Sequence, residues 1–159
     1  MFIYRARLLL TTLWVGSLWT IGYVVAPTLF ASLSDRVLAG TIAGNLFRVE
    51  AWLSIACAIL LIGLHWLSAK TDFSKRSGRE LLFICVMLAL TLIQYFGLQP
   101  LMAALRPVMH EQMGVISHGG LMSSEAKVQF GILHGITSAL YLVESVMGLL
   151  LILKMQRPE

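Results

Sequence analysis

Charged residues are scarce in this chain. Only 13% of its 159 residues are Asp, Glu, Lys or Arg, whereas about 25% of the residues in a soluble domain are charged. Hydrophobic residues make up 58%, and a soluble protein of this length cannot bury so much apolar surface. The composition therefore excludes an ordinary soluble domain and indicates a membrane protein.

Cysteine and enzyme motifs are also scarce. The two cysteines, Cys57 and Cys85, lie within apolar stretches, where a free thiol behaves as a small buried hydrophobic residue. They form no disulfide framework. The sequence contains no Walker, G-x-S-x-G, H-E-x-x-H or C-x-x-C motif, so we expect that the protein is not an enzyme.

What the chain does have is four long apolar runs, at about residues 8–30, 41–68, 80–105 and 128–153. Each run is long enough to cross the hydrocarbon core of a bilayer, which takes about 20 mostly apolar residues in a helix. Short connections between the runs favour antiparallel neighbours. The sequence therefore predicts an all-α fold, an integral membrane up-down four-helix bundle that forms one domain over the whole chain.

Basic residues lie at the ends of the apolar runs and form no single patch, which excludes a nucleic-acid partner and leaves the lipid bilayer as the expected one. Cytoplasmic loops of membrane proteins are enriched in Lys and Arg. One side of the predicted bundle has eight of the 12 basic residues, namely Arg5, Arg7, Lys70, Lys75, Arg76, Arg79, Lys154 and Arg157. With four spans, this asymmetry predicts cytoplasmic termini, and we expect a bacterial inner membrane.

The fourth run carries two ionisable residues, His134 and Glu144, on one side of the helix. Ionisable groups within membrane spans almost always face the bundle interior or a water-filled cavity. Gln94 and Tyr141 are the candidate partners of Glu144, because His134 is about 15 Å away along the same helix. We predict a polar intramembrane path formed by Glu50, Gln94, His134 and Glu144. The alternative is that these polar groups only hold the helices together.

Other polar residues are expected at the outer end of the bundle, near the lipid headgroups. They are Asn45, Arg48 and Arg106. Glu50 fits a cross-helix pair with Arg106 better than a pair with Arg48, because residues two apart on a helix point to different sides. The simplest interpretation is that this outer-end cluster locks the bundle.

Two glycines in the fourth run, Gly131 and Gly135, have the spacing that lets transmembrane helices approach closely. This face favours a second hypothesis for the function. In it, the protein is a structural or assembly module that binds another membrane protein, or a second copy of itself.

The connection before the fourth run contains several methionines and histidines. Thioether and imidazole ligands suit Cu(I), and Met109 and Met113 would share one face of a helix. Copper handling on the periplasmic side by Met109, His110, Met113 and His118 is therefore a third hypothesis. The alternative is an interfacial segment whose methionines contact lipid. No other metal or cofactor is expected.

Four stretches resemble a known family. They are G-S-L-W-T-I-G-Y-V-V-A-P-T-L-F-A-S-L at 16–33, A-G-T-I-A-G-N-L-F at 39–47, Q-P-L-M-A-A-L-R at 99–106 and F-G-I-L-H-G-I-T-S at 130–138. In this order they look like the uncharacterised four-span family that includes transmembrane protein 205. The resemblance covers nearly the whole chain and implies the four-span fold and a membrane location. One member of that family is linked to tolerance of platinum drugs, and for this chain we expect a transport, tolerance or accessory role that uses the polar path.

A more distant likeness concerns the first span, whose Gly…Pro-x-Leu-Phe pattern is similar to that of copper-resistance D-type proteins and of the four-helix protoporphyrinogen oxidase. In the oxidase, a His shortly after this pattern holds haem. Here residues 31–34 are Ala-Ser-Leu-Ser, and the resemblance therefore does not extend to a haem ligand. We expect no haem.

Overall fold

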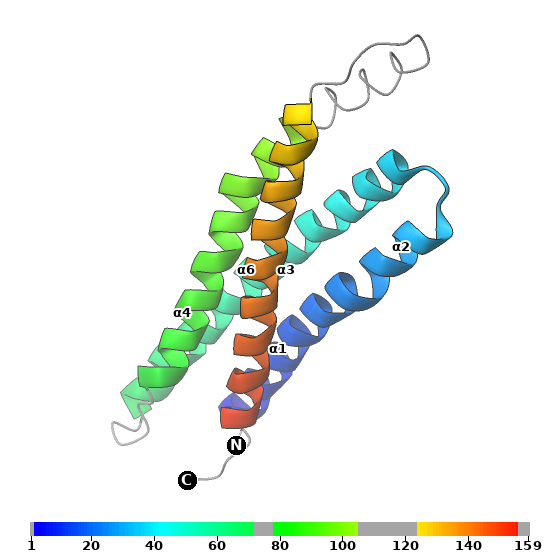
Figure 1. Cartoon of the computed structure of the whole chain (residues 1–159). Coiled ribbons are helices and arrows are strands. Elements are labelled where there is room, and N and C mark those ends of the chain that lie inside the picture. Colours follow the sequence, from blue (N-terminus) through cyan, green and yellow to red (C-terminus); the bar gives the residue numbers. More distant parts are fainter. Residues whose placement is uncertain (1, 72–77, 105–123, 156–159) are drawn as a thin grey trace.

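The computed structural model describes residues 2–71, 78–104 and 124–155, and these residues form four long helical rods (Figure 1). The first rod consists of α1 (Phe2–Trp19), the π-helical turn η1 (Thr20–Val25) and α2 (Ala26–Ser32). The second is α3 (Arg36–Thr71). The third consists of α4 (Gly78–Leu92), the π-helical turn η3 (Ile93–Leu98) and a continuation to Ala104. The fourth is α6 (Ser124–Met155).

Each rod contains a helix long and apolar enough to cross a membrane. The candidate spans are Phe2–Ser32, Leu38–Ser68, Gly78–Ala104 and Val128–Met155. A bilayer offers no hydrogen-bond partner to the backbone, and a helix satisfies its own backbone groups internally. The prediction of an all-α membrane bundle with four spans is confirmed.

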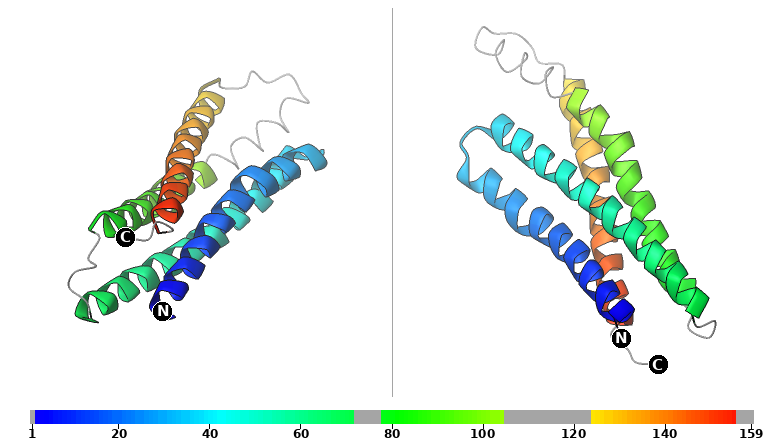
Figure 2. Two further views of the ribbon diagram at one scale, coloured as in Figure 1. Left: turned by 90° about the horizontal axis from the view of Figure 1, so that it is seen from below. Right: turned by 180° about the vertical axis from the view of Figure 1, so that it is seen from behind.

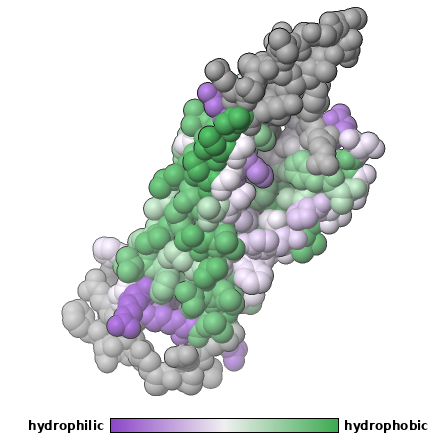
Figure 3. Space-filling view, viewed as in Figure 1, coloured by the Kyte–Doolittle hydropathy of each residue, from purple (hydrophilic) through white to green (hydrophobic). Residues whose placement is uncertain are grey.

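The surface of the rods is what a bilayer would contact. Large apolar side chains such as Leu9, Leu82 and Leu142 are more than half exposed. Figure 3 shows apolar side chains spread over the outward face of α4 and α6, with the largest group of hydrophilic residues near the lower end and smaller ones toward the upper end. Contact with lipid explains why this surface is not buried inside the protein.

The helices extend beyond the apolar runs that predict them. The first and second candidate spans each have 31 residues, which corresponds to about 46 Å of helix against a hydrocarbon core of about 30 Å. Polar residues at the ends continue the helical hydrogen bonding outside the core, and a tilt accommodates part of the excess length.

The four rods form two antiparallel hairpins that meet at one end and diverge at the other (Figures 1 and 2). At the end with Phe2, Gly78 and Met155, here called the closed end, α1 and α4 each contact both α3 and α6. At the other end, called the open end, α2 contacts α3 and η1. The molecule is therefore V-shaped.

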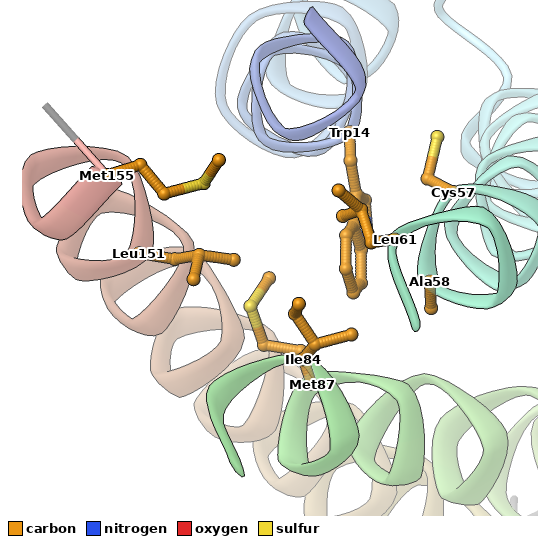
Figure 4. Packing of buried hydrophobic residues seen from close by; sticks show 8 residues of the cluster. All are labelled: Trp14, Cys57, Ala58, Leu61, Ile84, Met87, Leu151 and Met155. Carbon is orange, nitrogen blue, oxygen red and sulfur yellow. The ribbon is translucent and has the colours of Figure 1, made fainter. Parts of the chain in front are cut away.

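The closed end contains the main apolar core, to which all four rods contribute (Figure 4). Inside a bilayer, such a core is stabilised by close packing, because the surrounding lipid is equally apolar. Gly148 permits this packing, since a Cβ there would lie 2.8 Å from Val15 Cγ2 and 3.3 Å from Met87 Cε. The core residues are Trp14, Cys57, Ala58, Leu61, Ile84, Met87, Leu151 and Met155.

Polar contacts tie the same end together. Arg7 forms an ion pair with Glu80, joining α1 to α4, and the Tyr4 hydroxyl donates to the Met155 carbonyl at 3.2 Å. The first, third and fourth rods are therefore held at the closed end by both packing and hydrogen bonds.

Both π-helical turns precede a proline. Ala26 N–H bonds to Ile21 O, and the next residue is Pro27. A proline has no N–H and its ring clashes with the carbonyl four residues earlier, so the preceding helix is wound more widely. Gln99 N–H bonds to Gln94 O in the same way before Pro100. The first wide turn begins at Thr20, seven residues before Pro27.

Candidate functional site

Glu144 is the most deeply buried carboxyl group among the described residues. It lies in the half of α6 nearer to the closed end and is 2% exposed. Thr91 Oγ1 lies 2.6 Å from Glu144 Oε1, and Gln94 Nε2 donates to Glu144 Oε2 at 2.8 Å. Both carboxyl oxygens therefore have a partner on the third rod, inside the bundle.

The third rod presents these two partners because of its local winding. Thr91 lies in the last turn of α4, and Gln94 is the second residue of η3. Residues three apart share one face of a helix, and both side chains are buried against α6. π-helical turns occur frequently at functional sites, and η3 carries the amide that holds Glu144.

The hydrogen bonds fit the carboxylic acid form of Glu144. The Thr91 hydroxyl is 3.1 Å from the Met87 carbonyl and 2.6 Å from Glu144 Oε1, yet a hydroxyl has one proton and cannot donate to both. When Oε1 is protonated, Thr91 donates to Met87 and the carboxyl proton completes the contact with Thr91. Every polar atom then has a partner, and no charge is placed at a depth where charge is costly.

A second buried carboxyl group lies nearby on α3. Glu50 is 5% exposed and accepts a hydrogen bond from Ser54 Oγ at 2.5 Å, one turn along the helix. It is close enough to Glu144 and to Tyr141 for an electrostatic interaction with each. Two ionised carboxylates would repel each other in this low-dielectric region. Glu50 and Glu144 are called the carboxyl pair below.

Tyr141 lies one turn before Glu144 on α6 and packs against the first rod. Its hydroxyl donates to the Leu18 carbonyl at 2.6 Å, and its ring lies edge-on to Phe47 and Tyr23, at centroid distances of 5.4 and 6.3 Å. A Cβ on Gly22 would lie only 2.2 Å from Tyr141 Cε1, so the glycine leaves room for the ring. Tyr141 thereby connects α6 to both α3 and the first rod, where the hairpins begin to diverge.

The structure brings some of the predicted path residues together and leaves one apart. Gln94 and Glu144 are hydrogen-bonded, and Glu50 is within electrostatic range of Glu144. His134 is exposed and stacks on Phe130 of its own helix, at a centroid distance of 6.2 Å. In the part of the chain that the structure describes, the side of α6 that carries His134 is therefore open.

The predicted outer-end cluster is described only in part. Asn45 and Arg48 are exposed on α3, whereas Arg106 lies outside the described residues. Glu50 bonds to Ser54, so a pair with Arg106 stays a prediction. The copper ligands proposed from the sequence, Met109, His110, Met113 and His118, also lie outside the described residues.

A family model of a domain of unknown function, DUF4149, matches residues 9–111 of the chain. The protein belongs to this family. The matched region covers the first rod from residue 9 and all of the second and third rods. It includes Glu50, Thr91 and Gln94 but ends before Glu144. No curated protein and no solved structure matches the chain.

The site of this DUF4149 protein includes residues that sequence reasoning missed. Thr91 and Ser54 are hydroxyl partners of the two carboxyl groups. Their spacing was a usable signal, because Thr91 is three residues before Gln94 and Ser54 is four residues after Glu50, so each shares a helix face with its neighbour. Pro100 was a second usable signal, because a proline within a span marks a place where the helical winding changes.

Proposed function

We propose that this DUF4149 protein is a membrane transport or tolerance protein, or an accessory to one, whose carboxyl pair takes up and releases a proton. The observation that carries the proposal is the full burial of Glu144 between Thr91 and Gln94, with the buried Glu50 close by. Ionisable residues inside membrane bundles typically belong to ion pathways and proton relays. We propose no enzymatic activity.

The position of the carboxyl pair supports access from the open end. The hairpins diverge on that side, and α6 carries His134 and Thr137 between the open end and Glu144. A proton that reached the pair along this side of α6 would pass both residues. We therefore keep His134 in the proposed path, as a residue of its entrance, with water completing the path to Glu144.

The cellular setting is also part of the proposal. The excess of basic residues at the closed end favours cytoplasmic termini in a bacterial inner membrane. The resemblance of four sequence stretches to the family that includes transmembrane protein 205 favours a tolerance role. Together these features favour a protein that exports or excludes a toxic compound with the help of the proton gradient.

The experiment is a proton flux measurement on proteoliposomes with an enclosed pH-sensitive dye. An imposed pH gradient should drive flux through the wild-type protein, and Glu144→Gln should reduce this flux to the level of empty liposomes, because an amide does not release a proton. Glu80→Gln is the matched control, since it makes the same change at the closed end, where Glu80 pairs with Arg7. Wild-type flux equal to that of empty liposomes would overturn the proposal.

The second candidate is an assembly module. A Cβ on Gly131 or Gly135 would have no neighbour within 4 Å, so neither glycine is used for packing within the described structure. A second copy or another membrane protein would be the partner of this face. In that case Glu144 serves packing alone, and Glu144→Gln would leave the binding of the partner unchanged at equal folded concentration.

Copper handling by the connection before α6 is a third candidate. The sequence offers soft ligands there, with Met109, His110 and Met113 in close succession. Purified protein should compete with a chelating indicator for Cu(I), and the triple variant Met109→Leu/His110→Ala/Met113→Leu should not. Equal competition by the two proteins, or none by the wild type, would remove copper from the proposal.

A further inference from the structure

A pocket separate from the carboxyl pair opens on the surface between α3 and the third rod. Its volume is about 300 Å³, and it is lined by Arg48, Tyr95, Phe96, Gln99, Pro100 and Ala103. α3 packs against α4, the helix that precedes η3, and Trp52 of α3 reaches Tyr95 of η3. One wall therefore comes from the predicted outer part of α3, and the other comes from η3 and the helical turn after it.

The lining of this pocket is amphipathic. Arg48 provides a guanidinium group, and Gln99 provides an amide. Phe96, Pro100 and Ala103 form an apolar wall beside them. An Arg side chain recognises phosphate through parallel N–H···O bonds, so the pocket matches a molecule with an anionic phosphate at one end and hydrocarbon at the other.

Aromatic residues fix the position of this pocket. Trp52 Nε1 donates to the Tyr95 hydroxyl at 3.2 Å, across the gap between α3 and η3. The Tyr95 ring also lies edge-on to Trp52 and Phe96, at centroid distances of 5.9 and 4.8 Å. Arg48 and Gln99 each lie four residues, about one helical turn, nearer to the open end than Trp52 and Tyr95, so the polar end of the pocket is the end closer to the lipid headgroups.

The pocket faces the bilayer. Trp52 is 56% exposed and Phe96 is 62% exposed, and Arg48 is exposed as well. The third candidate span ends at Ala104, directly after the pocket wall. In the described part of the chain, no carboxylate forms an ion pair with Arg48, so its charge is available to a ligand.

We propose that this pocket binds one anionic phospholipid from the leaflet at the open end. The phosphate lies against Arg48 and the Gln99 amide, and one acyl chain follows Phe96 and Pro100 toward the centre of the bilayer. A phospholipid fits better than a free phosphate because half of the lining is apolar and open to lipid.

This lipid site does not depend on the proposed proton function. It shares η3 with the carboxyl pair, because Gln94 faces Glu144 while the next two residues, Tyr95 and Phe96, line the lipid pocket. The two proposals can be refuted independently, because the proton flux measurement tests the role of Glu144 and the lipid-binding measurement tests the role of Arg48.

Native mass spectrometry of the purified full-length protein tests the proposal. The protein is exchanged into detergent with equal amounts of phosphatidylglycerol and phosphatidylcholine, and the retained lipid is identified. We expect the wild type to retain one phosphatidylglycerol. Arg48→Gln should lower the preference for this lipid about fivefold, which corresponds to about 1 kcal/mol for one basic residue at a membrane surface.

Three further variants make the test specific. Arg5→Gln removes an exposed charge at the closed end and should leave lipid retention unchanged. Arg48→Lys keeps the charge and should retain most of the preference. Ala103→Phe keeps Arg48 and fills the pocket, so it should abolish retention, whereas a general attraction of anionic lipid to basic residues would persist.

Two outcomes would overturn the proposal. One is equal retention of phosphatidylglycerol by the wild type, Arg48→Gln and Ala103→Phe, each shown to be folded by its thermal unfolding transition. The other is displacement of the bound lipid by millimolar inorganic phosphate, because this would show that the pocket recognises the phosphate alone.

Discussion

Substitutions of Glu144 should distinguish the stability that comes from its hydrogen bonds from the role of its titratable proton. In the acid form, Glu144 has one donor directed at Thr91 and one acceptor facing Gln94. The Gln side chain in Glu144→Gln also has a donor and an acceptor in these places. We therefore expect its free energy of unfolding to stay within about 1 kcal/mol of the wild-type value, because no buried partner loses its hydrogen bond.

Glu144→Ala should behave differently. It removes the acceptor of Gln94, whose amide is only 9% exposed, and an unsatisfied buried donor costs about 1–3 kcal/mol. The cavity left by the shorter side chain adds about 1–2 kcal/mol. Thr91 loses little, because its hydroxyl still reaches the Met87 carbonyl at 3.1 Å. The expected loss of stability is about 2–5 kcal/mol in total.

The measurement is equilibrium unfolding in mixed micelles, with the fraction of SDS as the variable and tryptophan fluorescence as the signal. Asp35→Asn is the control for a carboxyl-to-amide change outside the pair, because the amide oxygen still accepts the hydrogen bond from Leu38 N–H. If Glu144→Gln destabilises the protein as much as Glu144→Ala does, the carboxyl group is needed in its ionised form, and the argument from the single Thr91 proton is wrong.

Two further predictions concern packing and orientation. Gly22→Ala should cost about 1–3 kcal/mol of stability, because the new methyl group would displace the Tyr141 ring. Gly16→Ala is the control and should be neutral or slightly stabilising, since nothing lies within 4 Å of the added Cβ. Equal effects of the two substitutions in unfolding experiments would contradict the contact between Gly22 and Tyr141. Reporter fusions at Ser77 and Gly119 should report opposite sides of the membrane, and a common side would contradict the proposed topology.

The number and type of helices could be predicted because bilayer physics acts on local sequence. A run of about 20 apolar residues in lipid has to satisfy its backbone internally, so composition within a short window was sufficient. The ends of the helices were less predictable. Residues 2–7 continue the first helix beyond the apolar run, because helical hydrogen bonding does not require an apolar side chain.

The candidate site was predictable only in part. Gln94 was named as a candidate partner of Glu144 from its depth, and the structure contains this hydrogen bond. The same argument from depth and helix face placed His134 in the bundle interior, yet it is exposed. The helical periodicity of a sequence shows which residues share a face of the helix. It does not show along how much of its length a neighbouring helix packs against that face.

The sequence alone determined that this is an all-α membrane protein with four spans, since that outcome depends on the free energy of each segment in lipid. Only the tertiary structure decided that the two hairpins diverge, that Thr91 completes the contacts of Glu144, and that Glu50 approaches from α3. These features depend on how rods of similar apolar character pack. Local features determine this packing. Examples are the missing side chain at Gly148, which lets Val15 and Met87 approach, and the wide helical turns before Pro27 and Pro100.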